Sequence, residues 1–404
     1  MKCGLLGRKL GHSYSPQIHS YLGDYSYELF EKEPEEIGAF LKHGDFTGIN
    51  VTVPYKKDVI PFLDELTPRA KQLGAVNTIV RRDGKLIGHN TDYFGFELMV
   101  KQSGLSVAGK KVLVLGSGGA SNTAVAVLQE LGAKVIIVSR NGVNHYGNLH
   151  MHKDAAVLVN TTPVGMFPHT GSCMVDLDKL PNLAGVLDVI YNPARTKLLL
   201  NAEQRGLVTI NGLLMLVAQA KEAAEWFTDS HIDDAVIEKV HGTLRRQMEN
   251  IILIGMPGCG KTTVGTALAE KLGRRFVDAD AELVEHAGRS IPDIFASDGE
   301  AGFRKLETEV LSSLGKQSGL VIATGGGCVT KNRNYPLLHQ NGTIFWLHRD
   351  LAKLPTDGRP LSQINKLTDM YRIRKPLYEA FSDFQIDNNA APDAAISQIL
   401  EVLP

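Results

Sequence analysis

The sequence contains little cysteine. The four cysteines are Cys3, Cys173, Cys259 and Cys328, which lie far apart and form no CxxC pair. This spacing matches neither a zinc site nor the disulfide framework of a small secreted domain. We therefore expect buried or incidental free thiols in a reducing compartment.

Long apolar runs and an excess of one charge are also missing. No apolar run reaches about 18 residues, the length needed to span a bilayer, and the first ten residues lack the apolar core of a signal peptide. The formal net charge is −1, so no electrostatic pattern favours nucleic acid or an anionic membrane as a partner. We expect a cytoplasmic protein, and the sequence does not distinguish a monomer from a homodimer.

The chain instead shows apolar runs that alternate with amphipathic segments, the pattern of βα units around a mostly parallel sheet. Short strands are expected within residues 1–100, a second strand series within 110–210, and helices within 211–245. A polar stretch then precedes the apolar run IILIG at 251–255. We place a domain boundary near 247–250, in a chain long enough for two or three domains.

A first glycine-rich turn, GSGGAS, occupies residues 116–121 between an expected strand and an expected helix. Glycines let the backbone approach a pyrophosphate at a helix N-terminus. The next strand ends in Ser139, Arg140 and Asn141, where an NAD site usually has an acidic residue, and a guanidinium favours the 2′-phosphate of NADP. The alternative is a structural turn with an exposed arginine.

The segment from Asn141 to Ala155 barely reaches the length of a parallel crossover and is rich in Asn, His and Gly. We therefore predict a short, irregular connection here.

Polar residues that fit redox chemistry lie in the first hundred residues. Ser13 and Ser15 precede a helix that starts with proline, where ordinary capping by Ser15 is the alternative. Lys56 follows an expected strand, and Asp92 lies in the motif GHNTD. An ammonium beside a carboxylate can donate a proton to a developing alkoxide, although each residue alone also fits a solvated charge or a turn.

The motifs GHSYSP, NVTVPYK, GAVNT, GHNTD, GSGGAS, NTTPVGM, YNP and NGLLMLVAQA occur in the order and spacing of shikimate dehydrogenase, which residues 1–240 resemble. The resemblance implies NADPH-dependent reduction of 3-dehydroshikimate, with Lys56 and Asp92 as the catalytic pair. It implies substrate contacts from Ser13, Ser15, Asn77, Tyr191 and Gln219. The implied NADP-binding residues are Gly116, Gly118, Gly119, Ala120, Ser139, Arg140, Asn141, Met166 and Gly212.

The chain departs from this family in its cofactor half. The family often has Asn-Arg-Thr or Asn-Arg-Ser after the second strand, with a further arginine four positions on, where this chain has Asn144. These departures favour weaker NADP binding or a relaxed choice between NADP and NAD.

A second glycine-rich loop, GMPGCGKT, spans residues 255–262 and matches G-x-x-x-x-G-K-[ST] between an expected strand and helix. In such a loop the backbone N–H groups hold phosphates, the lysine reaches the β- and γ-phosphates, and the hydroxyl binds Mg²⁺. The pattern predicts ATP-binding residues Gly258, Cys259, Gly260, Lys261, Thr262 and Thr263.

Residues farther along indicate the phosphate acceptor. Asp278 and Asp280 lie two apart at an expected strand end, and GGG follows another strand at 325–327. Arg304 and Glu307 have helical i, i+3 spacing, which also fits a surface salt bridge of little energetic value. Arg304, Arg359 and Arg374 are three spaced arginines, which fit an acceptor that carries a carboxylate together with the transferring phosphate.

This second constellation resembles shikimate kinase over about 250–400. The resemblance implies transfer of the ATP γ-phosphate to the 3-hydroxyl of shikimate. Asp280 would hold that hydroxyl and act as base, and Lys261 would contact the phosphates. The lid residue Arg359 would bridge substrate and phosphates, and Thr262 and Asp278 would serve Mg²⁺. The implied substrate contacts are Asp280, Arg304, Gly326, Gly327 and Arg374. An arginine before RPL and another near the C-terminus are missing, so ATP affinity is expected to suffer.

The sequence thus predicts an α/β protein with two enzymatic domains. Residues 1–248 would form a two-lobed dehydrogenase, with a substrate lobe at about 1–100 plus 212–248 and a Rossmann-like NADP lobe at about 101–211. Residues 249–404 would form a P-loop kinase with a parallel sheet. The alternatives are an NAD-linked quinate/shikimate dehydrogenase, a degenerate half that only binds, and a kinase for another acceptor such as gluconate or a nucleoside monophosphate.

Overall fold

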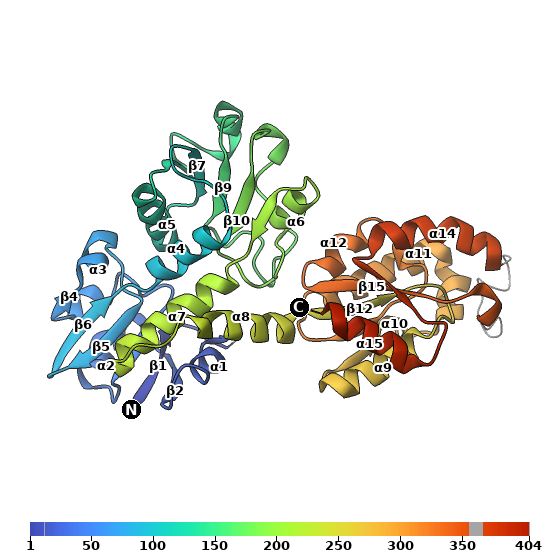
Figure 1. Cartoon of the computed structure of the whole chain (residues 1–404), viewed down its shortest axis with the longest axis horizontal. Coiled ribbons are helices and arrows are strands. Elements are labelled where there is room, and N and C mark those ends of the chain that lie inside the picture. Colours follow the sequence, from blue (N-terminus) through green and yellow to red (C-terminus); the bar gives the residue numbers. More distant parts are fainter. Residues whose placement is uncertain (12, 355–366, 404) are drawn as a thin grey trace. The chain divides into compact units, whose positions relative to one another are not determined.

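The computed structural model describes residues 1–11, 13–354 and 367–403. Its chain forms two compact units (Figure 1). Unit 1 comprises residues 1–166, 171–191 and 201–243, and unit 2 comprises residues 167–170, 192–200 and 244–404. Each unit is α/β, as the sequence predicts.

Unit 1 contains a six-stranded sheet in the order β2-β1-β3-β5-β6-β4. Its strands are β1 (Lys2–Gly7), β2 (Ser26–Glu31), β3 (Gly48–Val51), β4 (Glu65–Leu66), β5 (Thr78–Arg82) and β6 (Lys85–His89). The short helices of this region are α1 (Ser15–His19), α2 (Ile37–His43) and α3 (Pro68–Leu73), with 3₁₀ turns η1 (Pro34–Glu36) and η2 (Ile60–Phe62).

Strands β5 and β6 differ from the expected pattern of strands separated by helices. They pair antiparallel and are joined directly through Asp83 and Gly84, which both have positive φ. An Asp-Gly pair with two positive φ values makes the tight hairpin turn that suits the twist of adjacent strands. We did not expect β6 as a separate strand, and the Asp-Gly turn joins it to β5 without a helix.

The second sheet of unit 1 has five parallel strands in the order β11-β10-β9-β7-β8. The strands are β7 (Lys111–Leu115), β8 (Lys134–Val138), β9 (Val157–Asn160), β10 (Gly185–Asp188) and β11 (Val208–Ile210). The other elements of this region are α5 (Gly119–Glu130), η3 (Tyr146–His152) and η4 (Leu177–Lys179). Helix α6 (Lys197–Glu203) begins in unit 2 and ends in unit 1. The connection between β8 and β9 contains only η3, which is interrupted at Asn148. The predicted short, irregular connection is confirmed.

Helices α4 (Asp92–Gln102) and α7 (Leu213–Thr228) pack against each other in unit 1 (Figure 1). Gly95 of α4 allows this close approach, since a Cβ at this position would lie 2.6 Å from the carbonyl oxygen of Met215 and 3.2 Å from the Cβ of Gln219. The packing therefore brings the N-terminus of α4, with Asp92, close to Gln219 on α7.

Unit 2 contains a five-stranded parallel sheet in the order β13-β14-β12-β15-β16. Its strands are β12 (Asn250–Ile254), β13 (Phe276–Asp278), β14 (Val321–Ala323), β15 (Gly342–His348) and β16 (Phe384–Asp387). The described helices are α9 (Lys261–Leu272), α10 (Ala279–Ala287), α11 (Ile291–Gly315), α12 (Asn334–His339), α14 (Leu367–Phe381) and α15 (Pro392–Val402), with 3₁₀ turns η5 (Cys328–Thr330) and η6 (Leu351–Lys353). Strands β12 and β15 are almost wholly buried and form the centre of the core.

One residue, Glu249, separates helix α8 (Ala235–Met248) from β12, in the region where the sequence places the domain boundary. The end of this helix is attached to unit 2. Arg274 donates hydrogen bonds to the carbonyl oxygens of Arg246 and Glu249, and Gly319 N–H donates to the carbonyl oxygen of Met248.

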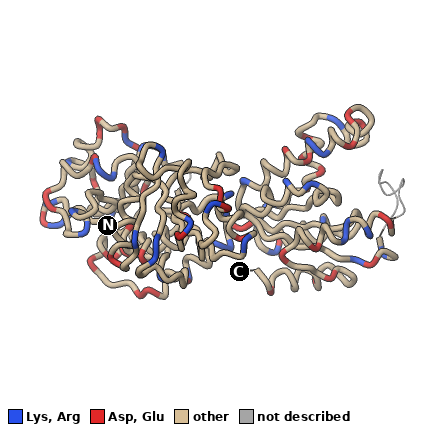
Figure 2. The backbone as a smooth tube through the Cα atoms, turned by 90° about the horizontal axis from the view of Figure 1, so that it is seen from above, with Lys and Arg blue, Asp and Glu red and all other residues tan. Residues whose placement is uncertain are grey.

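The cysteines are free thiols, and Cys3, Cys259 and Cys328 are buried. Burial raises the pKa of Cys3 to about 11 and that of Cys328 to about 12, so both remain protonated at neutral pH. Basic and acidic residues are interspersed along both units (Figure 2). Among the described helices, none has the length and hydrophobicity needed to cross a membrane.

We expect Gly95→Ala to lower the free energy of unfolding of unit 1 by about 1–3 kcal/mol, the usual effect of overpacking. The clash with backbone at Met215 outweighs the gain of about 1 kcal/mol in helix propensity. Urea unfolding followed by the fluorescence of Trp226, in a Trp346→Phe background, measures this change.

Gly171→Ala is the matched control, because a Cβ there meets no atom within 4 Å. Equal stability of the two variants would show that α4 and α7 do not depend on Gly95.

Candidate active sites

A lysine–carboxylate pair forms the centre of the first site, in unit 1. Lys56 Nζ donates to Asp92 Oδ2 over 2.5 Å, and the Asp92 side chain is 11% exposed while that of Lys56 is 23% exposed. Asp92 begins α4, where a carboxylate also interacts favourably with the helix dipole. The pair is thus dry enough for a strong interaction and open enough to meet a small molecule.

Asn77 connects this pair to α7. Its Nδ2 donates to Asp92 Oδ1 over 3.0 Å and to Gln219 Oε1 over 3.3 Å. Its Oδ1 accepts the Thr91 N–H over 2.7 Å. The structure therefore brings together four residues predicted for this site, Lys56, Asn77, Asp92 and Gln219, and adds Thr91, which lies inside the GHNTD motif.

Ser15 reaches the same region through buried polar groups. The Ser15 side chain interacts with Tyr27, whose hydroxyl donates to Asn50 Oδ1 over 2.7 Å. Asn50 Nδ2 donates in turn to the carbonyl oxygen of Asn77 over 3.3 Å. Ser15 is the first residue of α1 rather than its cap, and Ser13 Oγ accepts the Ser15 N–H over 3.2 Å. The alternative of helix capping by Ser15 was wrong.

Three further residues, Tyr191, Met166 and Gly212, were expected near the substrate or the cofactor. Tyr191 packs edge-on against Tyr14 with ring centroids 6.1 Å apart, and burial raises the pKa of its hydroxyl. Met166 is 45% exposed. Gly212 precedes α7, and a Cβ there would lie 2.0 Å from the Val189 carbonyl oxygen. Among the described residues, no hydrogen bond or ion pair joins these three residues to Lys56.

The first glycine turn presents bare backbone at the end of β7. Gly116 has φ +110°, and Cβ atoms at Gly118 and Gly119 would meet nothing within 4 Å. Helix α5 begins at Gly119 without a side-chain cap, so the amides of its first turn, including that of Ala120, face open space. These features fit a pyrophosphate group.

Arg140 is exposed in a tight loop after β8. The Ser139 N–H donates to the Asn144 carbonyl oxygen over 3.0 Å, and the Asn144 side chain hydrogen-bonds to His152 over 3.1 Å. Asn141 is exposed in the same loop. The short connection thus closes the loop. The loop after β8 carries the exposed guanidinium of Arg140 and no acidic residue.

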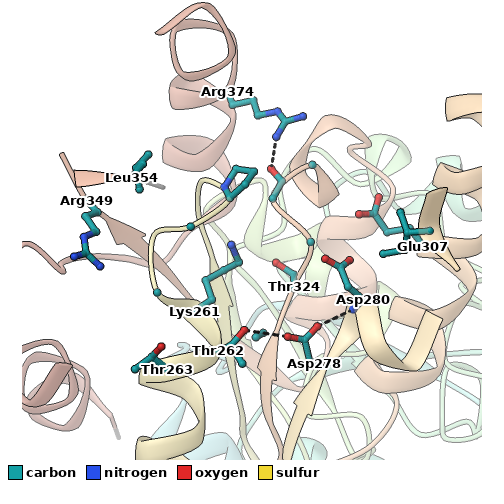
Figure 3. A pocket seen from close by; sticks show the side chains of 18 of the residues that line it. Lys261, Thr262, Thr263, Asp278, Asp280, Glu307, Thr324, Arg349, Leu354 and Arg374 are labelled. Carbon is teal, nitrogen blue, oxygen red and sulfur yellow. Dashed lines mark hydrogen bonds between the residues drawn. The ribbon is translucent and has the colours of Figure 1, made fainter. Parts of the chain in front are cut away.

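The second site occupies a cavity of about 960 Å³ in unit 2 (Figure 3). The loop after β12 contains Gly258 with φ +82° and Gly260 with φ +98°, which only glycine adopts readily. Lys261 starts α9 and its Nζ donates to the carbonyl oxygens of Gly255 and Met256 over 3.0 and 3.1 Å. Thr262 and Thr263 line the cavity, whereas the side chain of the loop residue Cys259 is buried.

Thr262 and Asp278 meet on the cavity wall, where Thr262 Oγ1 donates to Asp278 Oδ2 over 3.0 Å (Figure 3). Asp278 also caps α10 by accepting the Asp280 N–H over 3.0 Å. A hydroxyl and a carboxylate beside a phosphate loop fit Mg²⁺, which keeps several waters and takes its other ligands from phosphates. No cluster of three or more acidic, histidine or cysteine side chains suited to a metal occurs in the described chain.

The carboxyl groups of Asp280 and Glu307 have raised pKa values and are therefore weaker acids than exposed carboxyl groups. Burial, followed by the nearby charge of Asp278, raises the pKa of Asp280. Burial also raises the pKa of Glu307, although the neighbouring Arg304 opposes this shift. Both carboxyl groups approach Gly325, where a Cβ would lie 2.7 Å from Asp280 Oδ1 and 3.0 Å from Glu307 Oε1. A carboxylate with raised pKa in a cavity is a candidate base.

Arg304 and Glu307 form a buried pair. Arg304 Nη1 donates to both carboxylate oxygens of Glu307 over 2.9 and 2.8 Å, and each residue is 3% exposed. The alternative of a weak surface salt bridge was wrong, because one turn of α11 faces the core rather than solvent. Removing one member would leave an uncompensated buried charge.

The glycine turn after β14 fits between these groups. A Cβ at Gly327 would lie 2.1 Å from Arg304 Nη2, and a Cβ at Gly326 would lie 2.7 Å from Pro257. The Gly326 carbonyl oxygen accepts hydrogen bonds from Arg374 Nη1, over 3.1 Å, and from the Tyr378 hydroxyl. The turn is therefore held by α14 on one side and the phosphate loop on the other.

The structure brings the predicted kinase residues to one cavity, which is lined by Gly258, Gly260, Lys261, Thr262, Thr263, Asp278, Asp280, Arg304, Gly326, Gly327 and Arg374. Arg359 lies outside the described residues. Our sequence reasoning missed Tyr378 and Arg349. Tyr378 follows Arg374 by four residues, a spacing that places both on one helix face, but Arg349 has no sequence signal.

The fold and the two sites define the class of this protein, which combines a two-lobed unit containing a dinucleotide-type turn with a P-loop unit of the kinase type. Two family models match the chain, the shikimate dehydrogenase substrate-binding domain at residues 5–79 and shikimate kinase at residues 257–404. A curated shikimate dehydrogenase (NADP(+)) from Clostridium perfringens is 38% identical over 264 residues, which cover 60% of this chain and 97% of the relative.

Solved structures agree over the same part. Shikimate dehydrogenase 1 from Peptoclostridium difficile is 37% identical with a TM-score of 0.56, and the match covers 60% of this chain and 97% of that one. A Thermus thermophilus shikimate 5-dehydrogenase, solved with NADP(H) and shikimate, is 29% identical with a TM-score of 0.54 over 60% of this chain and 98% of its own. The chain belongs to the shikimate dehydrogenase family and carries a shikimate kinase domain at its C-terminal end.

We expect Asp280→Asn to lower the kinase rate by about 10²–10⁴-fold, the usual contribution of a positioned acid or base. The same substitution should stabilise unit 2 at neutral pH. Because the fold raises this pKa, the native state binds the proton more tightly, so wild-type stability falls as pH rises from the unfolded value of about 3.9 through the folded value.

Urea unfolding of wild type and Asp280→Asn between pH 3 and pH 8 measures this effect. The stability advantage of the variant should vanish below about pH 3.9, the unfolded pKa. An advantage that is constant with pH would contradict the role of ionisation.

Proposed function

We propose that the chain catalyses two consecutive reactions on one carbon skeleton. Unit 1 reduces the ketone of 3-dehydroshikimate with NADPH, and unit 2 phosphorylates the 3-hydroxyl of the resulting shikimate with ATP. The observation that carries this proposal is the coexistence of two sites on one chain, the Lys56–Asp92 pair and the P-loop cavity, in segments that match two families acting on the same acid.

In unit 1, Lys56 is the proton donor. Bound NADPH supplies the hydride for this reaction. As negative charge develops on the substrate oxygen, the Lys56 ammonium donates its proton to that oxygen. Asp92 holds the ammonium at 2.5 Å, and Asn77 hydrogen-bonds to both Asp92 and Gln219. Asn77 and Gln219 would bind the substrate hydroxyls. Ser13 and Ser15 would receive the substrate carboxylate.

In unit 2, Asp280 accepts the proton of the attacking hydroxyl. Burial raises the pKa of Asp280, which makes its carboxylate a stronger base than that of an exposed aspartate. Lys261, now turned onto loop carbonyls, would move to the transferring phosphate, and Thr262 with Asp278 would hold Mg²⁺. Arg304 and Arg374 line the cavity, and the carboxylate of the acceptor would bind beside them, because guanidinium groups form charge-assisted hydrogen bonds to carboxylates.

Two alternatives make different predictions. If one unit only binds its ligand and does not catalyse a reaction, the wild type would lack either the reductase or the kinase activity. A quinate/shikimate dehydrogenase linked to NAD would oxidise quinate with NAD⁺, and the guanidinium of Arg140 argues against it.

A coupled reaction tests the main proposal. With 3-dehydroshikimate, NADPH and ATP–Mg²⁺, the wild type should form shikimate 3-phosphate, detected by mass spectrometry. Lys56→Ala should lower NADPH oxidation by at least about 100-fold and leave phosphorylation of added shikimate unchanged. Lys261→Ala should abolish phosphorylation of added shikimate and leave NADPH oxidation unchanged, so each variant controls for the other. NADPH oxidation without the phosphate ester would refute the bifunctional proposal.

The choice of cofactor depends on Arg140. We expect Arg140→Ala to raise KM for NADPH by about 10–100-fold, since charge-assisted hydrogen bonds contribute about 1.5–3 kcal/mol, and to leave KM for NADH nearly unchanged. Initial rates with both cofactors measure the ratio.

Lys153→Ala removes another exposed cation near the same loop and serves as the control. Equal changes in KM for both cofactors would rule out recognition of the 2′-phosphate by Arg140.

A further inference from the structure

Arg349 is a cation of the kinase cavity to which neither the family resemblance nor the sequence assigns a role. It follows β15 directly and lines the cavity with Gly260, Lys261 and Thr263. Its Nε is buried and has no hydrogen-bond partner among the described residues. A buried guanidinium nitrogen without a partner is costly, and such groups call for a ligand.

The other lining cations are already engaged within the described chain. Arg304 pairs with Glu307 and Arg374 donates to a carbonyl of the glycine turn. Lys261 donates to loop carbonyls, and Lys353 Nζ donates to the carbonyl oxygen of Asn389 over 3.1 Å. Arg304 Nε also lacks a hydrogen-bond partner, but Glu307 neutralises the Arg304 charge, whereas the charge of Arg349 is available to a bound molecule.

The position of Arg349 shows which part of a nucleotide it can reach. A Cβ at Gly260 would lie 3.8 Å from Arg349 Nη1, so the guanidinium lies beside the phosphate loop at the start of α9. Figure 3 shows Arg349 on one side of this loop and Lys261 on the other. The labelled carboxylates, Asp278, Asp280 and Glu307, all lie on the Lys261 side.

The loop itself is held rigidly on the Arg349 side. Asn388, which is 3% exposed, donates from Nδ2 to the Cys259 carbonyl oxygen over 2.6 Å. A Cβ at Gly260 would lie 2.8 Å from the same nitrogen. The Asn388 N–H donates to the carbonyl oxygen of His348 over 2.8 Å. Asn388 thus joins the phosphate loop to the strand end that precedes Arg349, which favours binding without large rearrangement.

We propose that Arg349 binds the phosphate chain of the nucleotide from the outer side of the phosphate loop, opposite Lys261. The inference rests on the proposed kinase function of unit 2. An arginine is always charged and offers five donors to phosphate oxygens. The helix N-terminus and two cations then surround the polyphosphate from two sides, while the acidic groups remain with the metal and the acceptor.

Binding of ATP, inorganic tripolyphosphate and adenosine to the full chain, by calorimetry without acceptor, tests the proposal independently of turnover. Arg349→Ala should weaken ATP and tripolyphosphate by about 10–100-fold, corresponding to about 1.5–3 kcal/mol for hydrogen bonds to a charged group. Adenosine affinity and KM for shikimate should stay within about twofold. Arg349→Lys should restore part of the loss, because it retains the charge but not the fork geometry.

Lys353→Ala is the matched control, since this cation lines the same cavity but already has a backbone partner, and it should leave ATP affinity unchanged. Unchanged tripolyphosphate affinity in Arg349→Ala would overturn the proposal, as would a loss confined to adenosine, which would place the contact on the base. A lowered unfolding temperature with equal losses for ATP and shikimate would assign Arg349 a structural role. If the wild type binds tripolyphosphate but transfers no phosphate, the kinase proposal fails while the Arg349 contact stands.

Discussion

Both nucleotide turns depend on one constraint. Each needs glycine at particular positions after the carboxyl end of a buried parallel strand. Gly116 follows β7 with φ +110°, and Gly258 and Gly260 follow β12 with φ +82° and +98°. Residues other than glycine rarely adopt such positive φ values, because the Cβ atom clashes with the backbone. Helices α5 and α9 start at these turns without side-chain caps, so their first N–H groups stay available for phosphates.

The two sites solve the problem of buried charge differently. In unit 1 a lysine and an aspartate neutralise each other, and the Asn77 amide donates to the other oxygen of the aspartate. In unit 2 more charges meet in one cavity, and only some are paired. Glu307 neutralises Arg304, whereas Asp280 stays desolvated with a raised pKa. Such incomplete pairing destabilises the empty site and leaves interactions for substrates to complete.

Much of the fold was predictable because local patterns are strong in this chain. Apolar runs such as KKVLVLG and IILIG became β7 and β12, and the short crossover after β8 followed from its length and composition. The β5–β6 hairpin was missed, although its Asp-Gly turn was visible in the sequence. The burial of Arg304 and Glu307 was not predictable, since i, i+3 spacing places two side chains together without revealing which face of the helix is covered.

The sequence alone determined the order of the elements, the two glycine turns and the chemical types of residue beside them, because strand, turn and helix signals act over a few neighbouring residues. Only the tertiary structure decided which polar groups are dry and which partners they meet. Asn77 and Gln219 are 142 residues apart and hydrogen-bond because Gly95 lets α4 and α7 approach closely. Arg349 reaches the phosphate loop because β15 pairs with β12 and ends beside it. Contacts of this kind arise from packing between distant segments, which no local pattern encodes.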